Sequence, residues 1–174
     1  MAPKGGLELT LNGHSSLPAV RADPQTVVRE IRMVGYALIN SFLVQQRLYA
    51  DYLDLPPARA LVFLTVMVGS SQRYTRAPNL DDSYRGAKVL PRSSIVPMSR
   101  RSIAAATNLP RETVRRIVAE LIESGYLIDL GRRGVTPRIG EILTEPAQAL
   151  VRQLTAEVAR LTNELARLGA VVEG

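Results

Sequence analysis

Residues 111–116 (Arg-Glu-Thr-Val-Arg-Arg) concentrate charged and polar side chains at helical spacing. At 100° per residue, four positions share one helix face and two more flank it: Glu112, Arg116, Ala119 and Glu123, and Thr113 and Arg115. An arginine can donate two hydrogen bonds to guanine O6 and N7, and a glutamate can accept one from cytosine N4. The face therefore has the chemistry to read base edges. The simpler alternative is a solvated face on which Glu112 complements the positive helix N-terminus.

A short helix and a tight turn are predicted before this segment. Ser99 is a good N-cap for the short helix. This helix has a narrow apolar side made of Ile103, Ala104 and Ala106, with Leu109 beyond them. Asn108 tolerates left-handed backbone angles, so we expect the chain to leave the helix there. Pro110 would then open the second helix at its first position, where its missing N–H costs nothing.

The second helix is predicted to bury the side opposite its charged face. Its apolar residues recur at helical spacing: Val114, Ile117, Val118, Leu121 and Ile122. Gly125 would end the helix, because glycine readily adopts the left-handed conformation that closes a helix. The two helices and the turn between them therefore place residues 111–116 on an outward-facing surface.

A β-hairpin is predicted directly after this helix. Residues 126–130 alternate as a strand, residues 131–134 (Gly-Arg-Arg-Gly) suit a tight tip, and residues 135–139 return as the second strand. Arg132 and Arg133 would project from the tip, where they could reach phosphate or the minor groove. Alternatively, these two arginines only keep a loop soluble.

Residues 110–116 (PRETVRR) resemble the start of the recognition helix in the cyclic-AMP receptor/Fnr family, whose pattern is Arg-Glu-Thr-Val-x-Arg. The matching residues are Arg111, Glu112, Thr113, Val114 and Arg116. The resemblance implies that the two arginines and the glutamate read base edges, that the threonine meets phosphate and that the valine is core. Residues 99–127 also resemble the winged-helix domains of GntR, IclR and MarR regulators. The N-terminal part shows no pattern of a cyclic-nucleotide β-roll, so no effector is implied.

Composition agrees with a polyanion-binding segment. The formal net charge is +6, and residues 98–140 hold eight arginines against four acidic residues. The chain has no cysteine and none of the common nucleotide-binding, hydrolase or metal motifs, so we expect neither an enzyme nor a cofactor. No apolar segment at the N-terminus suggests a signal peptide, and no apolar run is long enough to span a bilayer. We therefore expect a cytoplasmic protein without a membrane partner.

Long helices are predicted on both sides of this segment, and they could carry a dimer. Asp23-Pro24 suits a helix start, and an apolar repeat continues to Tyr52 through Val27, Ile31, Val34, Leu38, Ser41, Gln45 and Leu48. A second helix over residues 59–73 is apolar on nearly all sides, so we expect it to be central and buried. Near the C-terminus, three-four spacing gives the seam of a short coiled coil: Val151, Leu154, Val158, Leu161, Leu165 and Leu168. This seam could meet a second copy, or it could pack on the first helix of its own chain.

The resulting organisation is mainly α with a small β-hairpin wing, a winged helix-turn-helix flanked by long dimerisation helices. Its parts are a flexible tail (1–22), a helical segment (23–75), a loop (76–98), the DNA-binding domain (99–140) and a dimerisation helix (141–174). We expect a homodimeric, sequence-specific regulator of transcription that binds an inverted repeat in double-stranded DNA, in an order of elements similar to that of MarR-type dimers. Base readout would come from Arg111, Glu112 and Arg116, and phosphate contacts from Ser99, Arg100, Arg101, Thr113, Arg115, Arg132 and Arg133.

Two other functions stay open. The protein could bind DNA without sequence preference, as an architectural or replication protein does. The winged helix could instead contact protein, and a neutral or apolar outer face on its second helix would favour that reading. A small-molecule effector is possible, but no residue identifies one.

Overall fold

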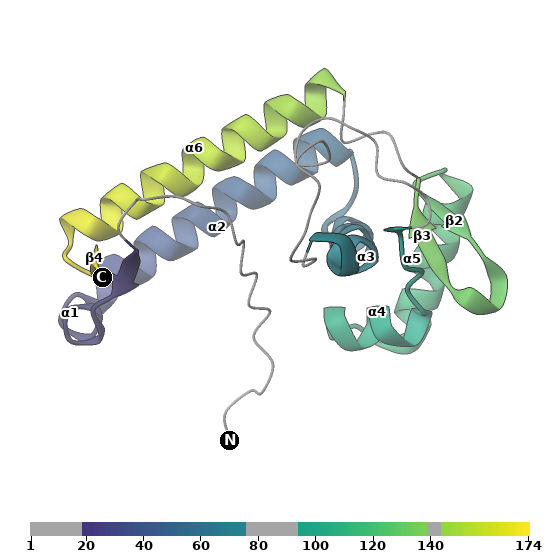
Figure 1. Ribbon diagram of the computed structural model, residues 1–174, viewed down its shortest axis with the longest axis horizontal. Coiled ribbons are helices and arrows are strands. Elements are labelled where there is room, and N and C mark those ends of the chain that lie inside the picture. Colours follow the sequence, from purple (N-terminus) through teal and green to yellow (C-terminus); the bar gives the residue numbers. More distant parts are fainter. Residues whose placement is uncertain (1–18, 76–93, 139–143) are drawn as a thin grey trace. The chain divides into compact units, whose positions relative to one another are not determined.

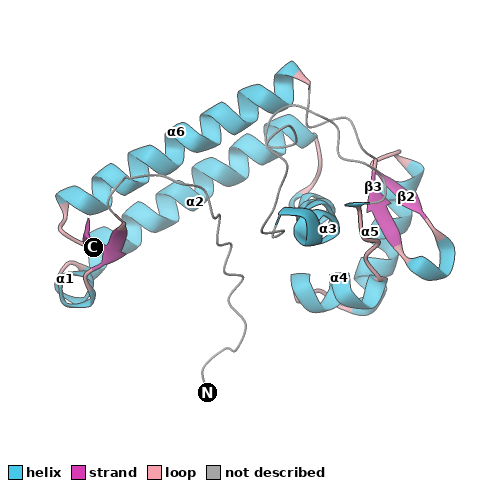
Figure 2. Ribbon diagram, in the orientation of Figure 1, coloured by secondary structure: helices cyan, strands magenta, loops and turns pink. Residues whose placement is uncertain are grey.

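The computed structural model describes residues 19–75, 94–138 and 144–174. These residues are mainly helical, with two small antiparallel sheets of two strands each (Figures 1 and 2). They fall into two compact units. We call residues 61–138 the central unit, and residues 19–60 with 144–174 the terminal unit. Each unit is described by itself.

Two long helices form the terminal unit. α2 (Ile31–Leu53) and α6 (Glu145–Arg167) have 23 residues each and lie side by side in antiparallel directions (Figure 1). Their contact buries mostly small side chains of α2, namely Val34, Ala37 and Ser41. The predicted C-terminal seam therefore lies on a helix that packs against the first long helix of its own chain.

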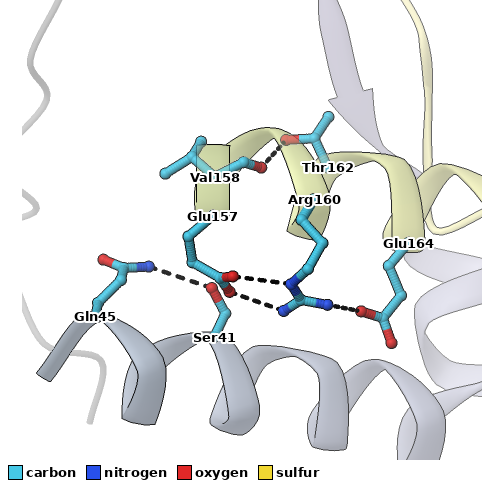
Figure 3. A network of polar contacts seen from close by, with 7 residues as sticks. All are labelled: Ser41, Gln45, Glu157, Val158, Arg160, Thr162 and Glu164. Atoms are coloured by element: carbon cyan, nitrogen blue, oxygen red, sulfur yellow. Dashed lines mark hydrogen bonds and ion pairs between the residues drawn. The ribbon is translucent and has the colours of Figure 1, made fainter. Parts of the chain in front are cut away.

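A buried polar network joins these two helices (Figure 3). The Glu157 side chain of α6 is 7% exposed, and its two oxygens accept hydrogen bonds of 2.7 and 2.8 Å from Arg160. Arg160 also donates to Glu164, at 2.5 Å. The Ser41 hydroxyl of α2 donates to Glu157 and accepts from Gln45. The bonds from Arg160 and then Ser41 lower the pKa of Glu157 to about 2 and keep the buried carboxylate ionised.

A small sheet closes one end of this helix pair. β1 (Val20–Ala22) pairs antiparallel with β4 (Val171–Glu173), so that Val20 lies opposite Glu173. The predicted flexible tail was thus wrong for its last three residues, and the C-terminal segment does not end as a helix. Both strands have only three residues, too few for an alternating pattern to predict them.

The single long helix predicted from residue 24 was also wrong, because the chain bends at Glu30. α1 (Pro24–Arg29) begins at Asp23, whose carboxylate accepts hydrogen bonds from the N–H groups of residues 25 and 26, as the Asp-Pro pair predicts. Asp23 also donates its own N–H to the Ala170 carbonyl, which ties α1 to the C-terminal segment. α2 runs alongside α6. The chain changes direction between α1 and α2 at Glu30, whose backbone angles are φ −100° and ψ 24°.

The apolar repeat was correct only in part. Val34 and Ser41 are buried as predicted, but Ile31 is 63% and Leu38 is 48% exposed. In α6, the seam residues Leu154, Leu161, Leu165 and Leu168 are half-buried, whereas Val151 and Val158 are exposed. The surface of each helix that faces the other is therefore rotated from the predicted stripe toward smaller or polar residues.

The central unit contains α3 (Pro57–Thr75) from residue 61 onward, α4 (Arg100–Thr107), α5 (Arg111–Glu123) and a hairpin of β2 (Leu127–Asp129) and β3 (Val135–Pro137). Its core is apolar and includes Val62, Val66, Ile103, Val114, Val118, Leu121, Leu127 and Val135. Phe63 of α3 meets Tyr126 edge to face, with ring centroids 5.3 Å apart. α3 is exposed at Leu61 and Val68, so it is not buried on all sides as predicted.

Among the described residues, no single helix is both long and apolar enough to cross a bilayer. α2 and α3 reach the required average hydropathy only when they are counted together across the break between them. Several predictions fall outside the described residues: the tail up to residue 18, residues 76–93 of the predicted loop, and residue 139 at the end of the second strand.

Candidate nucleic-acid interface

The turn between α4 and α5 has the geometry that the sequence predicts. The Ser99 hydroxyl accepts a hydrogen bond of 3.1 Å from the Ser102 N–H and begins α4. Asn108 ends α4 in the left-handed conformation, with φ 55° and ψ 24°. Pro110 is the N-cap of α5, one position earlier than predicted, and Arg111 is the first helical residue. α4 therefore ends and α5 begins within a turn of three residues, 108–110.

α5 separates its apolar and charged sides. Val114, Ile117, Val118 and Leu121 are almost completely buried, as predicted, and Ile122 is half-buried. In α4, Ile103 and Ala104 are buried, but Ala106 is exposed, contrary to the predicted apolar side. The outward side of α5 consists of exposed residues: Arg111, Glu112, Arg115, Arg116, Ala119 and Glu123. Thr113 is half-buried at the edge of this surface.

Two arginines on this surface form ion pairs within α5. Arg115 binds both carboxylate oxygens of Glu112, with its closest contact at 2.6 Å, and Arg116 donates to Glu120 at 2.9 Å. The bond from Arg115 lowers the pKa of Glu112, so this carboxylate stays ionised near neutral pH. Arg111, in contrast, forms no ion pair with any residue that the structure describes. Glu112 and Arg115 thus act as one preformed pair on the surface.

The hairpin presents two more arginines. Arg132 and Arg133 are exposed in a short 3₁₀ turn (Gly131–Arg133) that forms the tip in place of the predicted tight turn. Neither has an ion-pair partner among the described residues. The Leu130 N–H donates to the Gly134 carbonyl and closes the tip. The strands β2 and β3 are shorter than predicted but pair in antiparallel register, as expected for a hairpin.

The start of α4 is tied to this hairpin by a long-range ion pair. Arg100 donates to Asp129 of β2 at 2.9 Å, and Asp129 also accepts the Gly131 N–H at 2.9 Å. These two bonds, that of Arg100 first, lower the pKa of Asp129. The carbonyl and N–H of Met98 bind the backbone of Val135, which adds a second connection. The structure therefore holds α4, α5 and the hairpin together as one surface.

The residues predicted to hold phosphates differ in their availability. Arg101 is exposed and has no ion-pair partner among the described residues. Arg100 has Asp129 as its partner, and the Ser99 hydroxyl is used in the helix cap. The sequence shows no local sign of the positioning role of Asp129, which lies 29 residues from Arg100. It also left out Arg138, which is exposed one residue after β3 and was counted only toward the charge.

On α4, α5 and the hairpin, exposed arginines outnumber exposed acidic residues. Among the residues that the structure describes, no group of three or more His, Asp or Glu side chains is placed to hold a metal ion. A scan against protein-family models, a search of curated proteins and a search of solved structures find no match to this chain. The function is therefore inferred from the residues and contacts of the site.

Proposed function

We propose that this protein is a sequence-specific, double-stranded DNA-binding regulator of transcription, built on a winged helix-turn-helix and acting as a homodimer on an inverted repeat. The observation that carries the proposal is the two-sided α5. Its apolar side is buried, and its opposite side exposes Arg111, Glu112, Arg115 and Arg116 directly after a tight turn. A helix of 13 residues is about 20 Å long and fits a major groove.

The proposed roles follow from position and pairing. Arg111 and Arg116, near the start of α5, donate to base edges, since the N-terminal part of a recognition helix contacts the bases. Arg132 and Arg133 at the hairpin tip contact phosphate or the minor groove, together with Arg101. In a two-fold dimer, two such surfaces would lie about 34 Å apart, one turn of DNA.

A DNA-binding function without sequence preference is the second candidate. The arginines of the hairpin tip favour it, because phosphate contacts carry no sequence information. A protein-binding role is supported less well, since the outer side of α5 is charged and not apolar.

Selection from a random-duplex library at roughly physiological salt separates these candidates. Enrichment of a palindrome with half-sites one helical turn apart would support a dimeric sequence reader. Retention of DNA without enrichment of any sequence would support the second candidate. Failure to retain DNA would contradict both.

Arg116→Ala tests base readout directly. The variant should lose about 1–3 kcal/mol of binding free energy on the selected sequence and relax the preference at one base pair. Arg132→Ala should weaken binding to all sequences alike and reduce the salt dependence by about one counterion. Arg152→Ala, an exposed arginine of α6, is the matched control and should leave binding unchanged. Equal losses on selected and random DNA for Arg116→Ala would contradict its role.

A further inference from the structure

α2 has an outward side that is apolar although nothing in the described chain covers it. We call this the α2 outer face; it consists of Ile31, Gly35, Leu38, Ile39, Phe42 and Leu43. Its five large side chains are between 48% and 63% exposed. Soluble monomers rarely leave a contiguous apolar patch of more than a few hundred Å² in water. We therefore expect another apolar surface to cover the α2 outer face.

α6 extends this face. Phe42 directly follows Ser41, and Val158 directly follows Glu157, where Ser41 and Glu157 meet at the contact between the two helices. Phe42 and Val158 each lie one residue after the contact, so each is rotated by about 100° around its own helix axis, in the same sense. Because the helices are antiparallel, this equal rotation brings Phe42 and Val158 to the same side of the pair. Val151 follows Leu150 in the same way and is also exposed.

The size of the extended face matches a protein interface. It contains seven large apolar side chains, each about half exposed: Ile31, Leu38, Ile39, Phe42, Leu43, Val151 and Val158. Together they form an apolar face of several hundred Å², the same order as the ~800 Å² per partner of a standard interface.

A glycine at the centre of the face indicates what kind of surface fits it. Gly35 lies in the interior of α2, where glycine costs about 1 kcal/mol relative to alanine. Packing within the chain does not require it, since a Cβ at this position would meet no atom within 4 Å. It leaves a notch seven residues, or two helical turns, from the large ring of Phe42.

We propose that the α2 outer face binds the same face of a second copy of this chain, with the two α2 helices antiparallel about a two-fold axis between Leu38 and Ile39. This axis places Phe42 of each copy opposite Gly35 of the other, so a ring fills each notch. Leu38 then lies opposite Ile39. An isologous interface must be complementary to itself. The large side chain of Phe42 and the missing side chain of Gly35 provide this complementarity. The inference rests on the homodimer in the proposed function and assigns the interface mainly to α2, with α6 at its edge.

The mass of the full chain in solution, measured without DNA over a range of concentrations, tests this interface. The wild-type protein should have twice the 19.0 kDa mass of the chain. Phe42→Glu should raise the dimer dissociation constant at least about a hundredfold, because it puts two unpaired charges at the centre of the interface. Asn40→Glu adds the same charge to an exposed position on another side of α2 and should stay dimeric.

Gly35→Leu is a second test of the interface, needed because Phe42→Glu could dissociate the dimer simply by failing to fold. The position has open space and leucine is a better helix former, so the helix content should be kept or raised. The dimer should nevertheless dissociate, because the notch for Phe42 is filled. A monomeric wild type, or dimers of unchanged stability for Phe42→Glu and Gly35→Leu, would overturn the inference. DNA selection is a separate experiment, so failure of this interface and failure of DNA binding can be told apart.

Discussion

The outward sides of α5 and α2 differ in chemistry. α5 exposes four charged side chains within its first six residues, and two more arginines follow at the hairpin tip. The α2 outer face exposes five large apolar side chains and a glycine. A charged surface suits a hydrated polyanion, whereas an apolar surface gains only when another apolar surface covers it. This contrast matches the two proposals, which assign a polyanion to the surface of α5 and the hairpin and an apolar partner to the α2 outer face.

The interiors differ as well. The residues buried around α4, α5 and the hairpin are almost all apolar, whereas the contact between α2 and α6 buries Ser41 and ionised Glu157. An apolar core gives stability that does not depend on pH, and a buried carboxylate makes stability depend on it. The following variants test whether the two units can be changed independently.

Gly134→Ala should have the largest effect, and it should affect only the charged surface. Gly134 has φ 107° and ψ −152°, a conformation nearly restricted to glycine, and an added Cβ would clash with the Met98 backbone. We expect a loss of about 1–3 kcal/mol in the free energy of unfolding, measured by urea denaturation, together with weaker DNA binding.

Gly131→Asn is the control for this variant. Gly131 is left-handed but has open space around it, and asparagine tolerates that conformation. Both variants should be dimers in solution like the wild type, because α2 and α6 are unchanged. A change of mass in Gly134→Ala would contradict the independence of the two surfaces.

Glu112→Gln should have an intermediate effect on DNA binding. It releases Arg115 from its paired carboxylate and removes a negative charge, so affinity for random DNA should rise by about 1 kcal/mol and the salt dependence should steepen by about one counterion. Preference for the selected sequence over random DNA should fall, since a base-reading group is lost. Titrations at three salt concentrations would measure both changes.

Glu123→Gln removes the same charge from the last residue of α5, about 16 Å along the helix from Glu112. It should increase affinity less than Glu112→Gln does. Equal effects of the two variants would mean that only total charge matters and that the Glu112–Arg115 pair has no special role.

Glu157→Gln should have the smallest effect on the outward sides of α2 and α5. Its main effect should be on the pH dependence of unfolding. The folded pKa of Glu157, about 2, lies below its ordinary value of 4.5. Its stabilising contribution is therefore fully present above about pH 4.5 and is lost as the pH falls toward 2. The variant should be less stable than the wild type at neutral pH, and the difference should shrink at pH 2.

Thermal unfolding at several pH values would measure this change. Glu145→Gln breaks an exposed ion pair of the same helix and should leave the pH dependence as it is, because solvent screens such pairs. A Glu157→Gln variant with an unchanged pH profile would show that the buried network does not contribute in this way.

The sequence alone determined most of the central unit from α4 onward, because its signals are local. Ser99, Asn108 and Gly125 act within a few residues of themselves, and they set where the two helices begin and end. The buried stripe of α5 follows from helical periodicity, and the same periodicity places the charged residues on the opposite side. Each of these features depends on short-range geometry. The structure agrees with the prediction except that Pro110 is the N-cap of α5 instead of its first residue and that Ala106 is exposed.

Only the tertiary structure decided which side of each long helix is buried. The apolar residues of α2 extend around the helix from Val34 through Leu38 to Phe42. Periodicity therefore predicted one stripe with Val34, Leu38 and Ser41, and it could not show that the buried side is Val34, Ala37 and Ser41. The packing of α6 made that choice, because small side chains and the Glu157 network let the helices approach. The Asp23–Ala170 hydrogen bond, the pairing of β1 with β4 and the Arg100–Asp129 ion pair likewise join residues far apart in the chain. Such contacts leave no local pattern, since their energy exists only once the chain has folded.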